Sequence, residues 1–163
     1  DGHTAEAMEV SALIERLSVR LGSGRVRRFV PRDSHLPERE VTILSALCEA
    51  PAASSSGWQQ PEEADPPLRP LQIFEPPQPI EVLAEVPDGP PLKFRWRRVV
   101  HEVTLAEGPE RIAPEWWRTG GVTPTRDYYR IEDVQGRRFW VFRAGLYEEG
   151  VQAPPWFLHG LFA

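Results

Sequence analysis

The spacing of apolar residues divides the chain into a helical beginning and a β-rich end. Near the N-terminus apolar residues recur every three or four positions, which predicts an amphipathic helix that stops at Gly22. The residues with this spacing are Val10, Leu13, Ile14, Leu17 and Leu21. From residue 25 to 30 the period changes to two, which predicts a strand. One helix and one or two strands cannot form a core, so residues 1–47 are predicted to be the end of a larger domain.

The last part of the chain, residues 79–163, alternates between apolar and polar positions almost throughout. A strand break is expected at Gly108-Pro109 and a hairpin turn at residues 133–136. The predicted strands are 80–85, 92–97, 101–105, 129–131, 138–142 and 156–162. Short strands of this kind predict a small, mostly antiparallel β domain, either a barrel or a strongly bent sheet. With the first helix, the fold class is α+β.

Composition separates these two parts by a proline-rich segment. Residues 51–91 hold 11 of the 18 prolines, and 7 acidic groups against 1 basic group. Few backbone donors and few apolar side chains are available there, so the segment cannot build a core. We therefore predict a linker over residues 48–78.

The residues that carry most enzyme chemistry are scattered. His3, His35, His101 and His159 follow no metal-binding spacing, and Cys48 is the only cysteine. No glycine motif for phosphate is found, and no apolar run approaches the roughly 20 residues that cross a bilayer. We expect no catalytic residue, no metal site, no cofactor and no membrane contact, and we expect a cytoplasmic protein.

Four motifs, in the same order along the chain, resemble the C-terminal region of the ImuB family. They are ERIAPEWWR (110–118), TRDYYR (125–130), GRRFWVFR (136–143) and WFLHGLF (156–162). Residues 13–22 and 32–39 resemble the end of that family's little-finger domain. ImuB proteins are catalytically inactive homologues of Y-family DNA polymerases, and they act in bacterial damage-induced mutagenesis.

This resemblance implies a non-catalytic hub in SOS-induced error-prone translesion DNA synthesis. The family recruits a RecA-like accessory protein (ImuA), an error-prone C-family DNA polymerase and a sliding clamp to damaged DNA. The clamp-binding peptide is only partly matched by Gln72-Ile73-Phe74. Clamp binding is therefore expected through the full-length protein rather than through this chain. Association with the nucleoid after damage is also implied.

Aromatic residues indicate where a protein partner binds. Residues 92–163 hold 13 of the 16 aromatic side chains, more than a small sheet readily buries. The regular alternation places Phe94, Trp96, Trp140 and Phe142 in the core. Aromatic residues near loops and at the chain end are equally compatible with a position in the core and with a position at an interface. The predicted partner-binding residues are Trp116, Trp117, Tyr128, Trp156, Phe157, Leu158 and Phe162.

The positions of the arginines indicate an alternative function, which is nucleic-acid binding. Arg25, Arg27, Arg28 and Arg32 form a basic strand edge suited to phosphates and are predicted to contact DNA. A second set is interleaved with aromatic residues, as in single-strand binders. It consists of Arg95, Arg97, Arg98, Arg137, Arg138 and Arg143. The β domain would then contact single-stranded or damaged DNA, but the net charge of −5 favours protein binding.

Overall fold

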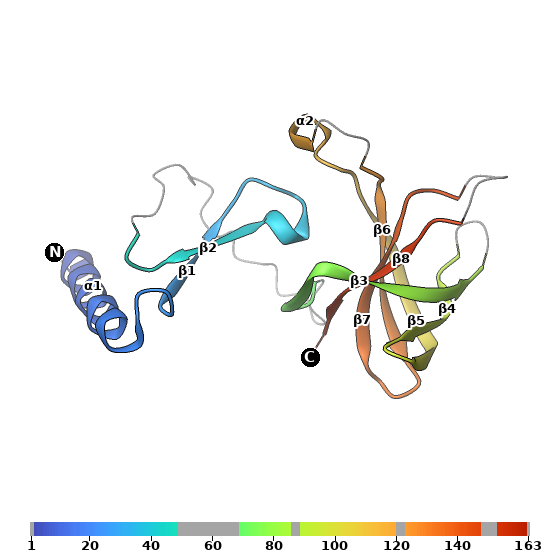
Figure 1. Cartoon of the computed structure of the whole chain (residues 1–163), viewed down its shortest axis with the longest axis horizontal. Helices are drawn as coiled ribbons and strands as arrows, with labels where there is room; N and C mark the ends of the chain where they lie inside the picture. The colour runs from blue at the N-terminus through green and yellow to red at the C-terminus, as the bar shows by residue number, and fades with distance from the viewer. Residues whose placement is uncertain (1, 49–68, 86–88, 120–122, 148–152, 163) are drawn as a thin grey trace. The chain divides into compact units, whose positions relative to one another are not determined.

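The computed structural model describes residues 2–48, 69–85, 89–119, 123–147 and 153–162 (Figure 1). The chain forms two compact units, Asp1–Gln60 and Pro61–Ala163. Each unit is described by itself below. No helix within the described ranges is long and apolar enough to cross a membrane.

The first unit combines one helix with a two-stranded hairpin. Its elements are α1 (Gly2–Leu21), β1 (Arg27–Pro31), the 3-10 helix η1 (Pro37–Arg39) and β2 (Val41–Ser45). The predicted helix end at Gly22 is confirmed, because this residue has a φ of 98° and its amide nitrogen donates to the Ser18 carbonyl at 2.9 Å. β1 and β2 pair antiparallel with Phe29 opposite Ile43.

Several apolar side chains of this first unit remain exposed to solvent. On α1, Val10 and Leu13 expose 55% and 47% of their surface. On the hairpin, the facing residues Phe29 and Ile43 expose 62% and 51%. The described elements of this unit therefore leave much of their apolar surface uncovered, as expected for one helix and two strands.

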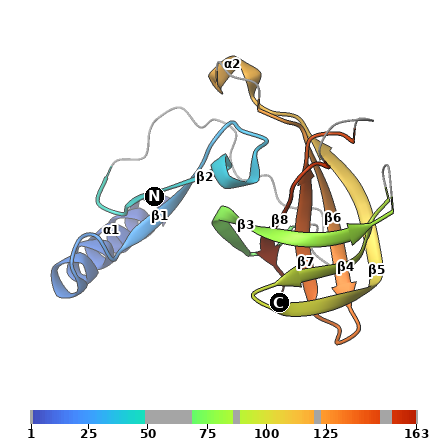
Figure 2. The same ribbon diagram turned by 45° about the vertical axis from the view of Figure 1, so that its right-hand side comes forward.

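The second unit contains a closed barrel of six antiparallel strands (Figures 1 and 2). They are β3 (Gln72–Ala84), β4 (Pro91–Trp96), β5 (Val99–Ile112), β6 (Arg126–Asp133), β7 (Arg138–Ala144) and β8 (Trp156–Leu161), with the short helix α2 (Trp116–Thr119) between β5 and β6. Each strand pairs with the next one along the chain, and β8 pairs with β3 to close the wall. The predicted mostly antiparallel β domain is confirmed, and it is a barrel rather than an open bent sheet.

Two strands are longer than the sequence predicted. β3 begins at Gln72, inside the segment predicted as linker, and Gln72 lies opposite Leu161 of β8. β5 continues through Gly108-Pro109, where a break was predicted. In both strands a register shift lies beside the prolines or glycine, so the pairing continues around these residues. Residues 49–68 of the predicted linker lie outside the described ranges.

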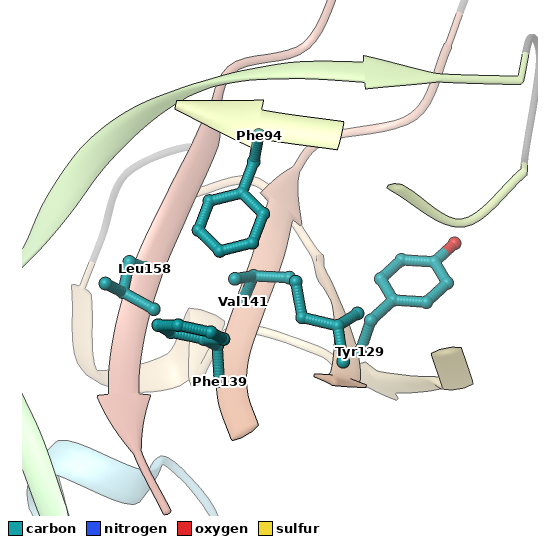
Figure 3. Close-up of a cluster of buried hydrophobic side chains, with 6 residues drawn as sticks. Phe94, Tyr129, Phe139, Val141 and Leu158 are labelled. Carbon is teal, nitrogen blue, oxygen red and sulfur yellow. The ribbon is translucent and has the colours of Figure 1, made fainter. Parts of the chain in front are cut away.

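The interior of the barrel is filled by apolar side chains from four strands. Figure 3 shows Phe94, Tyr129, Phe139, Val141 and Leu158 converging between the strands. Ile131 completes this buried cluster. Phe94 and Phe139 pack edge to face with ring centroids 5.1 Å apart, an arrangement that aromatic pairs favour.

Ionic groups close the interior at both ends of β6. At the start of the strand, Asp127 accepts hydrogen bonds from Arg111 at 2.7 and 3.0 Å and from Arg143 at 2.8 Å. At the end of the strand, Asp133 accepts from the Arg137 guanidinium at 2.7 Å and lies 3.0 Å from Nδ1 of His101. Burial by itself would raise the pKa of both carboxyl groups, but these hydrogen bonds lower each pKa below its usual value.

Candidate protein-interaction site

Two tryptophans stand exposed on the connection between β5 and β6. Trp116 and Trp117 lie on α2, with 72% and 58% of their surface exposed. Their rings meet edge to face at 5.8 Å. Figure 1 shows α2 projecting beyond the strands of the barrel. Of the tryptophans in the described ranges these two are the most exposed, and large exposed aromatic groups commonly mark interaction sites.

Neighbouring residues fix the conformation of this connection. Glu115 is buried, with 1% of its surface exposed, and its carboxylate lies 3.7 Å from Nε of Arg118. The Arg118 amide nitrogen donates to the Glu115 carbonyl at 2.9 Å, and that of Trp116 donates to the Pro114 carbonyl at the same distance. The two rings are thus presented by a short, hydrogen-bonded turn rather than by an extended loop.

A hollow of about 360 Å³ opens at the same end of the barrel. β5 ends and β6 begins beside α2, and this is the end at which β3 finishes and β8 starts. The hollow is lined by Ile80, Val82 and Ala84 of β3, by Trp156 of β8, and by residues of the segment before β8. Trp156 is half-buried there, with its ring 5.5 Å from that of Tyr129. This end of the barrel therefore combines exposed aromatic surface with a recess whose lining is partly apolar and also includes Glu81, Glu85 and Arg143.

The other predicted partner residues lie elsewhere. Phe157 is half-buried on the outer wall and stacks on Phe142 at 5.1 Å. Phe162 follows β8 at the opposite end of the barrel from α2, with the Arg138 guanidinium 5.8 Å from its ring. The structure thus places Trp116, Trp117 and Trp156 at one end, whereas Phe157, next to Trp156, faces the outer wall and Phe162 lies at the opposite end.

Burial removes Tyr128 and Leu158 from the surface. Leu158 is 0% exposed in the barrel interior, and Tyr128 is 1% exposed, with its hydroxyl 2.8 Å from Nδ1 of His159. A side chain without exposed surface cannot contact a partner while the barrel is folded. This corrects the prediction that these two residues are contact residues.

The sequence did not indicate a second buried aromatic layer on the outside of β6, β7 and β8. Trp140 stacks on Tyr128 at 4.2 Å and on His159 at 5.3 Å, and the guanidinium of Arg69 lies over the Trp140 ring at 5.9 Å. Phe139 and Val141 point into the barrel, so Trp140 and Phe142 point outward. Five successive residues of β7 are buried. The continuous apolar run FWVF was the signal of a strand buried on both faces.

The four arginines predicted to contact DNA do not form one surface. Arg27 and Arg28 point to opposite faces of β1 because they are consecutive in a strand. Arg28 is half-buried and donates to the Ala46 carbonyl at 2.8 Å, whereas exposed Arg27 donates to the Gly24 carbonyl at 2.9 Å. Arg25 and Arg32 are exposed on either side of the strand. DNA contact by these residues stays a prediction.

Three of the six arginines in the second set pair with carboxylates of the barrel. Arg143 and Arg137 bind the buried carboxylates of Asp127 and Asp133, and Arg95 pairs with Glu81 across two strands. Arg97 and Arg98 form the exposed turn between β4 and β5. In the part of the chain that the structure describes, no group of three potential metal ligands comes together.

Comparison with known proteins finds curated relatives of this chain. Protein ImuB of Caulobacter vibrioides, in strain NA1000 / CB15N and in strain ATCC 19089 / CIP 103742 / CB 15, is 48% identical over 160 residues. The match covers 94% of this chain, which spans about a third (33%) of the length of these curated relatives. No protein-family model matches the chain. No solved structure matches it. The resemblance to ImuB proteins that the sequence motifs indicated is therefore confirmed over almost the whole of this chain.

Proposed function

We propose that this chain is a non-catalytic protein-interaction module of an ImuB-type hub in SOS-induced error-prone translesion synthesis. Its partners would be a RecA-like accessory protein (ImuA), an error-prone C-family DNA polymerase, or both. The identity of 48% to Protein ImuB supports this role. Because the chain spans a third of those relatives, the partners of the whole protein are part of the proposal.

The observation that carries the proposal is the exposed pair Trp116 and Trp117. Trp is enriched among the residues that dominate binding energy, and two adjacent rings on a hydrogen-bonded turn lose little conformational freedom on binding. Covering two rings that are 72% and 58% exposed would remove a large apolar area from water. The recess beside Trp156, which has both apolar and charged lining residues, offers a place for a side chain of the same partner.

The remaining parts of the chain receive supporting roles in this proposal. Residues 1–47 would complete a little finger that contacts DNA through Arg25, Arg27, Arg28 and Arg32. Residues 48–78 would include the tether, and residues 79–163 would contain most of the interaction module. The sliding clamp would be bound by the full-length protein, in the cytoplasm and at the nucleoid after damage.

Binding to the purified accessory protein and C-family polymerase tests the proposal. The chain is immobilised, and the Trp116→Ala/Trp117→Ala variant is compared with wild type. Loss of two aromatic hot spots is expected to weaken binding by more than about 30-fold. A matched control, Leu105→Ala/Val134→Ala, removes two apolar side chains that are 53% and 58% exposed toward the end of the barrel opposite α2. It is expected to bind as wild type does.

Two results would contradict different parts of the proposal. Undiminished binding by the tryptophan variant would remove the site assignment. Failure of the wild-type chain to bind either partner would remove the hub role for this chain. A nucleic-acid role for the barrel is supported by other residues, Arg97 and Arg98, and does not depend on the tryptophan pair.

A further inference from the structure

The turn between β4 and β5 has an unusual combination of sequence and conformation. Trp96 pairs directly with Val99, so Arg97 and Arg98 are the two central residues of a tight hairpin. Their φ angles are 48° and 69°, both in the left-handed region. A two-residue hairpin with positive φ at both positions is a type I′ turn, for which Asn-Gly is strongly preferred. The chain instead has two consecutive arginines there.

Two arginines at these positions are informative because a residue with a Cβ disfavours a positive φ angle. Residues held in sparsely populated backbone regions concentrate at binding and catalytic sites. A departure from local preference is therefore expected where the side chains serve another purpose. At this turn the side chains supply two positive charges at the tip of a hairpin.

The two guanidinium groups differ from their neighbours in their pairing. Lys93 pairs with Glu102 at 2.6 Å, and Arg130 pairs with Glu107 at 3.0 Å. Among the described residues, no ion pair joins Arg97 or Arg98 to a carboxylate, and both side chains are exposed. Their charges are therefore available to an external anion.

Arg97 is also held in place before any ligand binds. Its guanidinium carbon lies 4.6 Å from the centre of the Trp96 ring. The Trp96 ring is itself fixed, because its Nε1 donates to the Gln78 side chain at 2.8 Å. Stacking on an aromatic face leaves the edge of a guanidinium, with its N–H groups, free to donate.

Among the described residues of β5 near the turn, the exposed carboxylate of Glu102 is already paired with Lys93. The β6–β7 turn lies at the same end of the barrel, joined to β5 by a hydrogen bond from the Val134 amide to the Glu102 carbonyl at 3.1 Å. It contributes Arg137 and Arg138, and its Asp133 is buried. Next to the arginines, Val99 and Val100 are 50% and 60% exposed.

We propose that the Arg97–Arg98 turn binds phosphate groups of a nucleic-acid backbone. A guanidinium fork matches the geometry of a phosphate, and two adjacent forks suit a polymer with one negative charge per nucleotide. The exposed side chain of Val99, which pairs with Trp96, and the edge of the Trp96 ring offer apolar contact to sugars and bases. This surface lies at the end of the barrel opposite α2, so the module has one end for protein and one for nucleic acid.

Fluorescence anisotropy with a labelled oligonucleotide tests this assignment on the whole chain. The oligonucleotide is used single-stranded and paired with its complement, since the backbone phosphate is common to both. The variant Arg97→Asn/Arg98→Gly removes both charges and introduces the preferred turn residues. It is expected to lose at least about tenfold in affinity and to show a smaller salt dependence. Its Tm is expected to equal or exceed that of wild type, so the loss does not reflect unfolding.

The matched control is Arg69→Ala/Arg130→Ala. It removes the same number of charges from two arginines that pair with Glu110 and Glu107 and lie outside the arginine set interleaved with aromatic residues. It is expected to change affinity by less than about threefold. An equal loss in this control, or wild-type affinity in the turn variant, would overturn the proposal. So would absence of binding by the wild-type chain at low salt.

A competition experiment decides the class of ligand. A poly-glutamate peptide of equal charge is added to the complex of the chain with the oligonucleotide. Weak competition supports the phosphate backbone as the ligand. Competition as strong as that of unlabelled oligonucleotide would overturn it in favour of an acidic peptide. The tryptophan pair takes no part in this experiment, so the two proposals fail separately.

Discussion

The buried carboxylate of Asp133 has two structural roles. Its oxygens accept hydrogen bonds from the amides of Gln135 and Arg137 at 2.9 and 3.0 Å, which shapes the β6–β7 turn. The same group binds the Arg137 guanidinium and lies beside His101, so it also closes one end of the interior. Asp127 performs the second of these functions at the other end with Arg111 and Arg143.

These two carboxylates predict a loss of stability in acid. Burial opposes ionisation, but the arginine hydrogen bonds outweigh it, so both folded-state pKa values lie below the ordinary value of 3.8. A lowered folded pKa contributes stability above the unfolded pKa and loses it as the pH falls below about 4. Urea unfolding of wild type is therefore expected to show a falling free energy from pH 5 to pH 3.

Neutral variants are the control for this pH dependence. Asp133→Asn and Asp127→Asn are each expected to lower the unfolding free energy at pH 7 by about 1–3 kcal/mol, because charge-assisted hydrogen bonds are lost. Each is also expected to flatten the dependence between pH 5 and pH 3. A variant that keeps the full wild-type dependence would show that the substituted carboxylate is not responsible.

Gly160 predicts a steric effect at a single residue. A Cβ at this position would lie 2.5 Å from Cγ of Pro70 and 2.7 Å from the Gln72 carbonyl oxygen. Gly160→Ala is expected to lower the unfolding free energy by about 1–3 kcal/mol, measured by thermal or urea unfolding. Gly24→Ala is the control, because nothing lies within 4 Å of its added Cβ. Equal stability of the Gly160 variant and wild type would contradict the close contact.

The burial of aromatic side chains was predicted correctly at some positions and not at others. Phe94, Trp140 and Phe142 were predicted in the core and are 2%, 1% and 3% exposed, whereas Trp96 is half-buried. Tyr128 was assigned to the surface and is buried. Its cover includes Trp140, which comes from the neighbouring strand. Burial of this kind depends on which strands are paired, and the spacing of residues along one strand does not reveal that pairing.

At the scale of elements, the turn signal at residues 133–136 was correct, whereas the break signal at Gly108-Pro109 was not. The β6–β7 hairpin forms where Asp133-Val134-Gln135-Gly136 predicted it, and Gly136 has the positive φ of 77° that the turn requires. The lengths of β3 and β5 were underestimated because proline and glycine are usually read as strand breaks. Bulges allow these strands to continue, and a bulge depends on the partner strand.

Substitution of tryptophan is expected to have little effect on stability in α2 and a large effect in β7. Trp116→Ala/Trp117→Ala on α2 is expected to change the unfolding free energy by less than about 0.5 kcal/mol, since both rings are largely exposed. Trp140→Ala on β7 is expected to cost about 3–5 kcal/mol, because a buried ring between aromatic neighbours leaves a cavity. Differential scanning calorimetry of the variants checks both. A large loss of Tm in the α2 variant would show that its rings support the fold.

At the scale of the whole molecule, the two units predict different behaviour when separated. All residues of the barrel core come from the second unit, Pro61–Ala163. A fragment of residues 61–163 is therefore expected to unfold cooperatively in urea and to keep the near-UV circular dichroism of its buried aromatic residues. A fragment of residues 1–60 is expected to show no cooperative transition, because so few elements bury little apolar surface. A non-cooperative barrel fragment would contradict the division.

The pairing of β3 with β8 has a consequence for the order of strands along the chain. Five of the six seams of the barrel join neighbours in sequence, and only this seam joins its first and last strands. Gln72 lies beside Leu161, so a short peptide linker can join these ends and new ends can be opened between other strands. Such a circular permutant is expected to keep the same barrel. It would fold at a different rate, because the seam that closes the longest loop would move to another pair of strands.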